Sequence, residues 1–467
     1  MISKENFKKI NDYLWEYQKT GEMKVPARIY VSEKMLNEVF KDRSVEQLIN
    51  TATLPGIVNY SMAMPDIHEG YGFPIGGVAA MDAENGVISP GGVGYDINCG
   101  MKLLKSDLSE KDILPHLEKL AAEIQKEVPS GLGKGRQIKL SIDELDKILK
   151  GGAKKLVEDG YGEQEDIENC ESNGCIEQAD SEAVSSHAKN RGRDQVGTLG
   201  SGNHFLEIQK VDEIFDEETA KKFGLFKNQI VVMVHTGSRG LGHQIATDYI
   251  QLMMKTMAKY NISLPDRELA CVPFKSAEGQ KYFKAMSAGA NYAWANRQMI
   301  THYIRKAWKE ILGPSTGSRL KAVYDVAHNI AKIEKYEING KEIELIVHRK
   351  GATRAFPGQP VLIPGSMGTA SYVLVGTEQG RDSWYSTCHG AGRTMSRHAA
   401  IKAISGQEVI NQLQNKGILV KCYSMRGIAE EAPQAYKNID EVTEVVHRAG
   451  LSKKVARLKP LAVIKGE

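Results

Sequence analysis

Asp96 and Cys99 lie three residues apart in the glycine-rich segment GGVGYDINCGM, residues 91–101. Glycine permits backbone conformations that other residues avoid and lets other groups approach closely, at a cost in conformational entropy. A carboxylate and a thiol in such a loop could bind a metal ion together. A tight turn around a buried free cysteine would explain the same residues, because cysteine is often buried as a small hydrophobic side chain. The loop alone leaves both interpretations open.

Four of the twelve histidines lie in unusual surroundings, and each of these four has Gly, Asn, Ser or Thr beside it; they are His204 in GTLGSGNHFLE, His235 in VVMVHTGSRGLGH, His328 in YDVAHN and His389 in STCHGAGR. His235 and His328 end apolar, strand-like runs, where sites on α/β scaffolds gather. Imidazole suits transition metals, a thiolate can bridge two ions, and a carboxylate suits harder cations. Together with Asp96 and Cys99, these histidines indicate a site for two metal ions, the usual device for phosphoryl chemistry.

Glycine-rich turns with the sequences SGNH, PGSMG and HGAGR offer backbone N–H groups to anions. Arg239, Arg393 and Arg397 lie close to these turns, and the last two would share one helix face if residues 393–404 are helical. A solvated basic helix face would explain the same arginines. The chain contains no Walker motif, so the sequence predicts phosphate-binding turns that are not a P-loop.

The composition is that of a globular protein with a substantial core, since 41% of the 467 residues are hydrophobic and 25% are charged. A net charge of +3 permits a nucleic-acid partner without demanding one. No apolar run approaches the ~18 residues of a membrane helix, and the N-terminal segment MISKENFKKINDYLWEY lacks an apolar signal core. We therefore expect no membrane association and a cytoplasmic location. The six cysteines do not form a disulfide framework, and the close pair Cys170 and Cys175 lacks the second pair of a zinc knuckle.

Hydrophobic periodicity predicts alternating helices and strands in one large domain over residues 1–467. Helices are expected after the capping residue Ser109, over 143–158, over 276–312 before Gly313-Pro314, and from 393 to the end of the chain. Strands are expected over 229–236, 321–328, 342–348 and twice within 360–377, with a tight hairpin turn at 338–341. Residues near 160–185 form an acidic, loop-rich insertion. The order is no simple βαβ alternation, so we predict a mixed α/β (α+β) class with mixed sheets and neither a Rossmann nor a barrel fold.

Eight motifs give the chain its resemblance to a known family. GGVGYDINCGM, GTLGSGNHFLEI, VHTGSRGLGH, VAHN, PGSMGTASYVLVG and STCHGAGR occur in this order, and MPDIHEGYGFPIGGVAA and the C-terminal VIKG also fit. From about residue 25 onward the chain resembles the RtcB-type RNA ligases. The resemblance implies an RtcB-type fold around a central metal and GTP site. It also implies an enzyme that uses GTP and two Mn²⁺ ions to join RNA 2′,3′-cyclic phosphate or 3′-phosphate ends to 5′-hydroxyl ends, in tRNA splicing or RNA repair.

The resemblance also implies roles for individual residues. His389 resembles the nucleophile that GTP guanylylates before the GMP passes to the RNA 3′-phosphate. Asp96, Cys99 and His204 resemble the ligands of one manganese ion, and Cys99, His235 and His328 those of the other. The residues that resemble GTP contacts are Asn203, His204, Phe205, Leu206, Glu207, His328, Asn329, Pro364, Gly365, Ser366, Met367, Ser371, His389, Gly390, Ala391, Gly392 and Lys465. Tyr436 is a further candidate, for packing on the base.

Some of these assignments also make sense chemically, and others rest on the resemblance alone. In an extended segment, His204 could face the metals while Glu207 points to the opposite face and accepts hydrogen bonds from guanine N1–H and the 2-amino group. Ligand softness by itself favours zinc or iron over manganese, so the choice of manganese comes from the resemblance. Some members of the family depend on a small activating protein, and a partner of that kind is left open here.

Two other functions would use the same residues. A two-metal phosphoesterase would need the metal ligands but no histidine that carries GMP, so GTP would leave no label on the protein. A non-enzymatic RNA-binding protein with a structural metal would bind RNA without His389. The mild net charge and the lack of an aromatic RNA-binding motif count against the second alternative.

Overall fold

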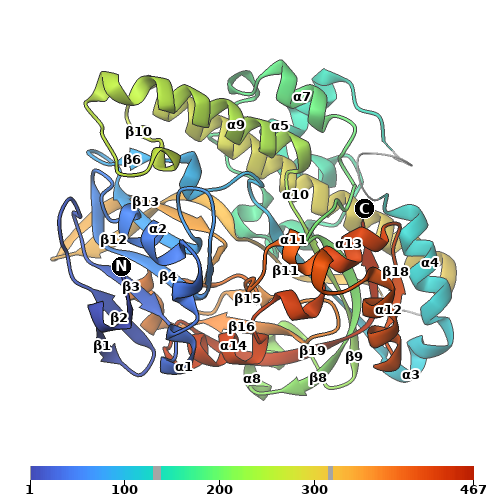
Figure 1. Cartoon of the computed structure of the whole chain (residues 1–467). Coiled ribbons are helices and arrows are strands. Elements are labelled where there is room, and N and C mark those ends of the chain that lie inside the picture. The colour runs from blue at the N-terminus through green and yellow to red at the C-terminus, as the bar shows by residue number, and fades with distance from the viewer. Residues whose placement is uncertain (1, 130–137, 314–318, 467) are drawn as a thin grey trace.

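The computed structural model describes residues 2–129, 138–313 and 319–466. Two large mixed β-sheets lie beneath a layer of helices (Figure 1). The first sheet has the order β1-β2-β3-β4-β5-β13-β12, with bounds Phe7–Asn11, Leu14–Tyr17, Ala27–Tyr30, Ile57–His68, Ile75–Asp82, Lys341–Lys350 and Asn329–Ile338. The second has the order β11-β7-β9-β8-β19-β16-β15, with bounds Lys321–Ala327, Gly100–Ser109, Gln229–Thr236, Phe205–Ile214, Ser452–Lys465, Ser371–Gly376 and Pro360–Ile363. This architecture confirms the predicted mixed α/β class.

Smaller elements complete the sheets. A short strand, β18 (Leu419–Lys421), pairs in parallel with β19. Two two-stranded ladders join β6 (Val87–Ile88) to β10 (Val272–Pro273) and β14 (Ala352–Arg354) to β17 (Ser386–Cys388). The largest hydrophobic cluster among the described residues contains side chains from Phe7 to Ile464, so it includes residues from both ends of the described chain. The expectation of one domain over residues 1–467 stays a prediction.

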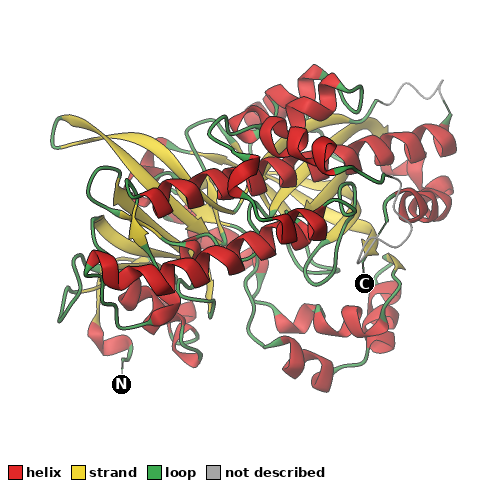
Figure 2. Cartoon of the chain, turned by 90° about the horizontal axis from the view of Figure 1, so that it is seen from above, coloured by secondary structure: helices red, strands yellow, loops and turns green. Residues whose placement is uncertain are grey.

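The helices are mostly short, and the two longest lie side by side across the sheets (Figure 2). Helices of eight or more residues are α2 (Ser44–Thr51), α4 (Leu117–Glu127), α5 (Ile142–Glu158), α9 (Arg239–Thr256), α10 (Ala277–Leu312), α12 (Gly406–Asn415) and α14 (Ile439–Arg448). The shorter ones are α1 (Glu33–Leu36), α3 (Glu110–Ile113), α6 (Gln164–Glu168), α7 (Ser186–Gly192), α8 (Glu217–Phe223), α11 (Arg397–Ala403) and α13 (Met425–Glu430). No helix in the described ranges combines the length and the apolar character needed to cross a membrane.

Helix α10 confirms the longest predicted helix and packs against α4, α5 and α9. Ser276 caps it by accepting a hydrogen bond from the backbone N–H of Gly279, as N-cap serines do. The predicted apolar face is buried at Ile300, Ile304 and Ala307. The helix ends at Leu312, with Gly313 as its C-cap, whereas Pro314 lies outside the described residues.

The predicted metal ligands lie at one end of the second sheet, where β7 and β8 begin and β9 and β11 end. β7 begins at Gly100, directly after Cys99, and pairs antiparallel with β9 and β11. The register pairs Met101 with His235 and Gly100 with Ala327, the residue before His328. On the other side of β9, Phe205 pairs with His235, so His204 lies one residue beyond the same end of the sheet. Strand register therefore brings together ligands that are far apart in the sequence.

Several predicted elements have the expected bounds. The strand over 229–236 is β9, which is buried throughout, and the helix over 143–158 is α5. The hairpin turn at 338–341 joins β12 to β13, with Asn339 and Gly340 both at positive φ as a type I′ turn requires. After Ser109 the helical region is interrupted, since α3 is separated from α4 by a 3-10 turn at Leu114–His116.

The prediction that residues 393 to the end are helical is wrong in two places. The helix near residue 393 begins only at Arg397, so Arg393 lies in the preceding loop. The chain then returns to the second sheet as β18 and β19, and β19 is fourteen residues long. β19 lies between β8 and β16, so both of its backbone edges are paired, and most of its side chains on both faces are buried. A strand with one exposed face shows alternating apolar and polar residues. The lysines and the arginine of β19 do not follow that alternation, so the pattern does not predict a strand.

Residues 163–182 contain only short helical turns, and their acidic residues contact the strands that carry the site. Glu171 is fully buried and accepts hydrogen bonds from the backbone N–H of Ala327 and from Lys332. Asp166 forms a bidentate ion pair with Arg305, at 2.6 and 2.7 Å. This segment therefore braces the end of β11, next to His328.

Candidate active site

A pocket of about 310 Å³ lies at the edge where β7, β8, β9 and β11 meet. Its lining includes most of the predicted site residues: Asp96, Cys99, Asn203, Phe205, His235, His328, Asn329, Pro364, Gly365, Ser366, Met367, His389, Gly390, Ala391, Gly392 and Lys465. Arg393, Arg397 and Tyr436 line it too. His204, Leu206, Glu207 and Ser371 are buried next to it and are not part of the lining. The motifs thus come together at one pocket, while the individual roles stay predictions.

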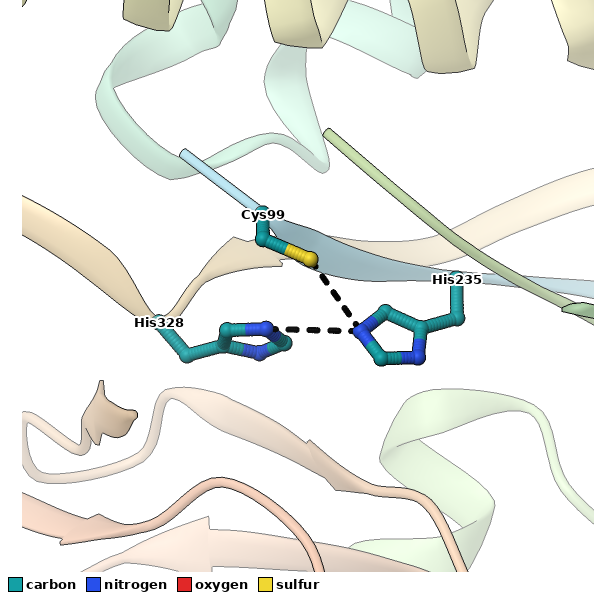
Figure 3. A group of neighbouring side chains, drawn as sticks. All are labelled: Cys99, His235 and His328. Carbon is teal, nitrogen blue, oxygen red and sulfur yellow. Dashed lines mark hydrogen bonds between the residues drawn. The ribbon is translucent and has the colours of Figure 1, made fainter. Parts of the chain in front are cut away.

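The predicted metal ligands form two groups of three that share Cys99. In one, Asp96 Oδ2 lies 2.9 Å from His204 Nε2, which lies 3.4 Å from Cys99 Sγ. In the other, His235 Nε2 lies 3.2 Å from Cys99 Sγ and 3.4 Å from His328 Nε2. Figure 3 shows the thiol of Cys99 pointing toward the His235 ring, and the His235 ring facing that of His328.

The donor chemistry of these groups fits metal ions. Burial lowers the pKa of His204, His235 and His328 below the ordinary value, so at neutral pH each ring is neutral and has a lone pair for a cation. Burial and the nearby charge of Asp96 raise the pKa of the Cys99 thiol, which a bound cation would deprotonate. A buried set of nitrogen, sulfur and oxygen donors suits a transition metal. Among the described residues, the groups that could hold a metal include neither Cys170 nor Cys175.

A fully buried arginine holds the three ligand-bearing segments in register. Arg297 of α10 donates from Nη1 to the backbone oxygens of Asn98 and Thr236, at 2.8 Å each. Its Nε donates to Asp325 of β11, also at 2.8 Å. These contacts fix the backbone beside Cys99, beside His235 and three residues before His328. No local pattern in the sequence distinguishes Arg297 from the other arginines.

His389 lies at the pocket wall with one ring nitrogen already engaged. Its Nδ1 lies 2.5 Å from Asp66 Oδ2, which also accepts hydrogen bonds from the backbone N–H groups of His389 and Gly390. Burial alone would raise the pKa of Asp66, but the His389 ring and these hydrogen bonds keep that pKa below its ordinary value. An ionised carboxylate only accepts, so the proton of a neutral His389 is on Nδ1 and Nε2 has a free lone pair. The ring lies 4.9 Å, centroid to centroid, from that of His328.

If His389 is the nucleophile that the resemblance implies, the Asp66→Asn variant should react with a nucleotide about 10²-fold more slowly at His389 while binding that nucleotide with similar affinity. Asparagine retains the shape of Asp66 but cannot balance the positive charge that the His389 ring gains on bonding to phosphorus. The measurement is the single-turnover rate of covalent nucleotide capture, with thermal unfolding as a check on the fold. A wild-type rate in Asp66→Asn would show that the contact only anchors the loop.

A second buried carboxylate organises the other side of the pocket. Glu431 accepts hydrogen bonds from Arg393, Arg397 and the hydroxyl of Tyr436. The two arginines therefore converge on Glu431, and the expectation that they share one helix face is wrong because α11 begins only at Arg397. Arg239, the third arginine near these turns, is the first residue of α9, and its Nε donates a hydrogen bond to the hydroxyl of Thr198. Sequence patterns gave no signal for Glu431, because its role depends on partners that lie 34 and 38 residues away in the chain.

The polar atoms of Asn329 and Lys465 already have partners inside the protein. Asn329 donates to the backbone oxygen of Asp96 and accepts from the backbone N–H of Gly351. Lys465 donates to the backbone oxygens of Gly202 and His204, at 2.5 and 2.9 Å. Both side chains therefore position the loops around the pocket as well as lining it.

Taken together, these features describe an α/β protein with a candidate two-metal site and a pocket suited to a phosphate ester. The model of the family described as tRNA-splicing ligase RtcB matches residues 47–466. The chain is 53% identical over 475 residues to the tRNA-splicing ligase RtcB of Thermococcus kodakarensis, covering 98% of each chain. It is 52% identical over 476 residues to that of Archaeoglobus fulgidus, again over 98% of each, and 53% identical over 459 residues to that of Methanococcus maripaludis, over 95% of each. The chain belongs to the RtcB family of tRNA-splicing ligases, which confirms the resemblance seen in the motifs.

Proposed function

We propose that this protein joins RNA 2′,3′-cyclic phosphate or 3′-phosphate ends to 5′-hydroxyl ends, with GTP as the energy source and His389 as the covalent carrier of GMP. The observation that carries the proposal is the His389 ring, whose Nδ1 is held by Asp66 while the ring lies beside the metal-ligand residue His328. Family membership supports RNA as the substrate and tRNA splicing as the process.

The proposed reaction has three bond exchanges. His389 Nε2 attacks the α-phosphorus of GTP, the bond to the β-phosphate oxygen breaks, and pyrophosphate leaves. An oxygen of the RNA 3′-phosphate then takes the GMP, and Nε2 leaves as the imidazole whose Nδ1 proton Asp66 has held throughout. The 5′-hydroxyl oxygen finally attacks the 3′-phosphate phosphorus, its proton goes to solvent, and GMP leaves. A 2′,3′-cyclic phosphate is first opened by water to a 3′-phosphate.

The two groups of ligands would hold two ions, which we propose to be manganese. Asp96, Cys99 and His204 would bind one, and Cys99, His235 and His328 the other. Bound there, the ions would neutralise phosphate charge and favour in-line displacement. Ligand softness alone would still favour zinc or iron, so the choice of manganese rests on the family resemblance.

Incubation with α-labelled GTP and Mn²⁺ tests the proposal directly. The wild-type protein should acquire acid-labile label with the loss of pyrophosphate, as a phosphoramidate requires. A two-metal phosphoesterase would hydrolyse phosphate esters and leave the protein unlabelled. Repeated RNA joining by the purified chain alone would show that no small activating protein is needed, whereas one turnover per chain would point to such a partner.

We further propose that Glu207 reads the guanine base. Glu207 is buried and accepts a hydrogen bond of 2.6 Å from Gln209, which also bonds to Ser371. Ser371 in turn accepts from the backbone N–H of Gly365 in the PGSMG turn, so Glu207 is connected to this wall of the pocket through Gln209 and Ser371. Burial raises the pKa of Glu207 to about 8. A guanine donating its N1–H and 2-amino hydrogens would stabilise the ionised carboxylate that burial now disfavours.

The Glu207→Gln variant should be more heat-stable than the wild type at pH 9 and yet discriminate GTP from ATP at least about tenfold less well. The folded protein retains a proton on Glu207 that the unfolded chain releases near pH 4.5, so stability falls as pH rises from about 4.5 to 8. Glutamine does not ionise, so it removes this loss of stability with rising pH. It also removes the carboxylate that would accept both hydrogen bonds from guanine. The measurements are thermal midpoints at pH 4 and 9, and labelling of the protein by GTP and ATP. Lower stability at pH 9 with an unchanged nucleotide ratio would make Glu207 a purely structural residue.

A further inference from the structure

Three aromatic rings form a row that leads away from the pocket wall. Tyr71 lies in the loop between β4 and β5, Tyr95 directly precedes Asp96, and His243 lies near the start of α9. The ring centroids of Tyr71 and Tyr95 are 5.5 Å apart, edge to face, and those of Tyr95 and His243 are 4.8 Å apart and stacked. Both tyrosines line the pocket and are half-buried, whereas His243 is exposed. None of the three has a role in the function proposed above.

The loop that carries Tyr71 is fixed in place. The buried ammonium group of Lys350 donates hydrogen bonds to the backbone oxygens of Tyr71 and Phe73. Gly72 has a φ of +70°, and a Cβ atom there would lie 2.4 Å from the backbone oxygen of Glu268. Its N–H also donates to the carboxylate of Glu268, at 2.9 Å. The Tyr71 ring is therefore presented by a rigid loop, and a ligand that stacks on it would lose little entropy in ordering the protein.

A cation lies at the outer end of the row. Arg191 is exposed at the end of α7, which packs against α9, and it donates to Gln244, the neighbour of His243. Aromatic faces followed by an arginine are the groups that proteins use to bind single-stranded nucleic acid, because bases stack on the rings and the cation contacts a phosphate.

The row shares the pocket with the residues expected to bind GTP, but no hydrogen bond or ring contact among the described residues joins Tyr71 or His243 to them. Those residues are linked by their own contacts, with Lys465 on the backbone of His204 and with Arg393 and Tyr436 on Glu431. Tyr95 is instead joined to this group through Asp96 and its contact with His204, and both of these are candidate metal ligands. The row therefore approaches the candidate metal ligands from Tyr95, and the residues expected to bind GTP approach them from Lys465.

We propose that Tyr71, Tyr95 and His243 form a stacking subsite for unpaired bases of an RNA strand whose end enters the pocket, with Arg191 contacting its backbone. This inference rests on the proposed RNA-joining function and specifies where the substrate lies. Joining requires two RNA strands, and either could lie on the row. Both strands present the same feature to the rings, which is a single-stranded end next to the reacting phosphate.

The experiment measures the binding of two short labelled RNA strands separately, one with a 5′-hydroxyl end and one with a 3′-phosphate end. Tyr71→Ala and His243→Ala should each raise the Kd for one of the strands about tenfold, the loss expected for one stacked base. Tyr71→Phe retains the ring and should bind like the wild type. Phe226→Ala removes an exposed aromatic ring near the opposite end of β9 from His235, and serves as the matched control.

A strand with one abasic nucleotide near its end makes the test specific to stacking. The wild type should bind the abasic strand about tenfold more weakly than the intact strand. Tyr71→Ala should bind both strands with the same affinity, because the stacked base is already lost in that variant. Unchanged Kd values for both strands in Tyr71→Ala and His243→Ala would overturn the inference. A raised KM for GTP in the labelling of Tyr71→Ala or His243→Ala would also overturn the inference, since the row would then bind GTP and not the RNA strand. Absence of label in the wild type would instead contradict the proposed function, independently of these binding data.

Discussion

The His389→Ala protein should acquire no covalent nucleotide from α-labelled GTP and should join no 3′-phosphate RNA ends. Only His389 places an imidazole nitrogen at the pocket wall with its other nitrogen held by the buried carboxylate of Asp66, among the parts of the chain that the structure describes. Alanine removes the proposed nucleophile and leaves both groups of candidate metal ligands in place. Label on the protein and joined RNA on a denaturing gel are the two measurements.

Two controls separate the nucleophile from the rest of the site. RNA supplied with GMP already attached to its 3′-phosphate should be joined by His389→Ala, because only the earlier steps need the histidine. His116→Ala changes an exposed histidine in the 3-10 turn before α4 and should label normally. Full label on His389→Ala would assign the covalent step to another residue.

Cys99→Ser should lose bound manganese and joining activity together, each by at least about tenfold. The Cys99 thiol belongs to both groups of candidate metal ligands, so its replacement should weaken both proposed sites at once. A serine hydroxyl is a poor substitute, because it does not ionise as readily as a thiol in contact with a cation. Metal content measured after desalting, together with activity across a manganese titration, gives the result.

Alkylation gives an independent measure for the wild-type protein. Manganese should slow the modification of Cys99 by iodoacetamide, read from its peptide by mass spectrometry, since a coordinated thiolate is a weaker nucleophile. Cys422, which is half-buried and belongs to neither group of ligands, should react equally with and without the metal. Cys422→Ser is the matched variant and should retain its manganese. Full metal content in Cys99→Ser would remove the cysteine from the ligand set.

Hydrophobic pattern was enough for elements whose burial follows a simple rule. β9 is buried on both faces and appears as a continuous apolar run, and α10 repeats apolar residues along one side. β19 could not be recognised in this way, because its place in the sheet depends on pairing with β8 and β16, which come from distant parts of the chain. Lysines at its ends and Pro460 near a register shift also hide a central strand.

In the candidate site, too, some residues are indicated by local sequence patterns and others only by their contacts in the fold. The metal-ligand candidates and His389 could be found from motifs, because their residue types are unusual in glycine-rich turns. Asp66, Arg297 and Glu431 are buried charges whose meaning depends on a partner, and no local pattern names that partner. Asp66 lay within the quoted motif MPDIHEG, so an acid in an apolar run was a signal that could have been followed.

The position of β19 has a consequence for how the protein is made. A ribosome delivers this strand last among those that the structure describes, yet the sheet needs it in the interior, between β8 and β16. Until translation reaches residue 465, both neighbours present unpaired backbone edges, which are templates for association with other chains. The edge of β8 therefore stays unpaired from the synthesis of Ile214, and that of β16 from the synthesis of Gly376, until β19 is made. Since Lys465 of this last strand also braces the loop that carries His204, a prematurely terminated chain cannot complete the site.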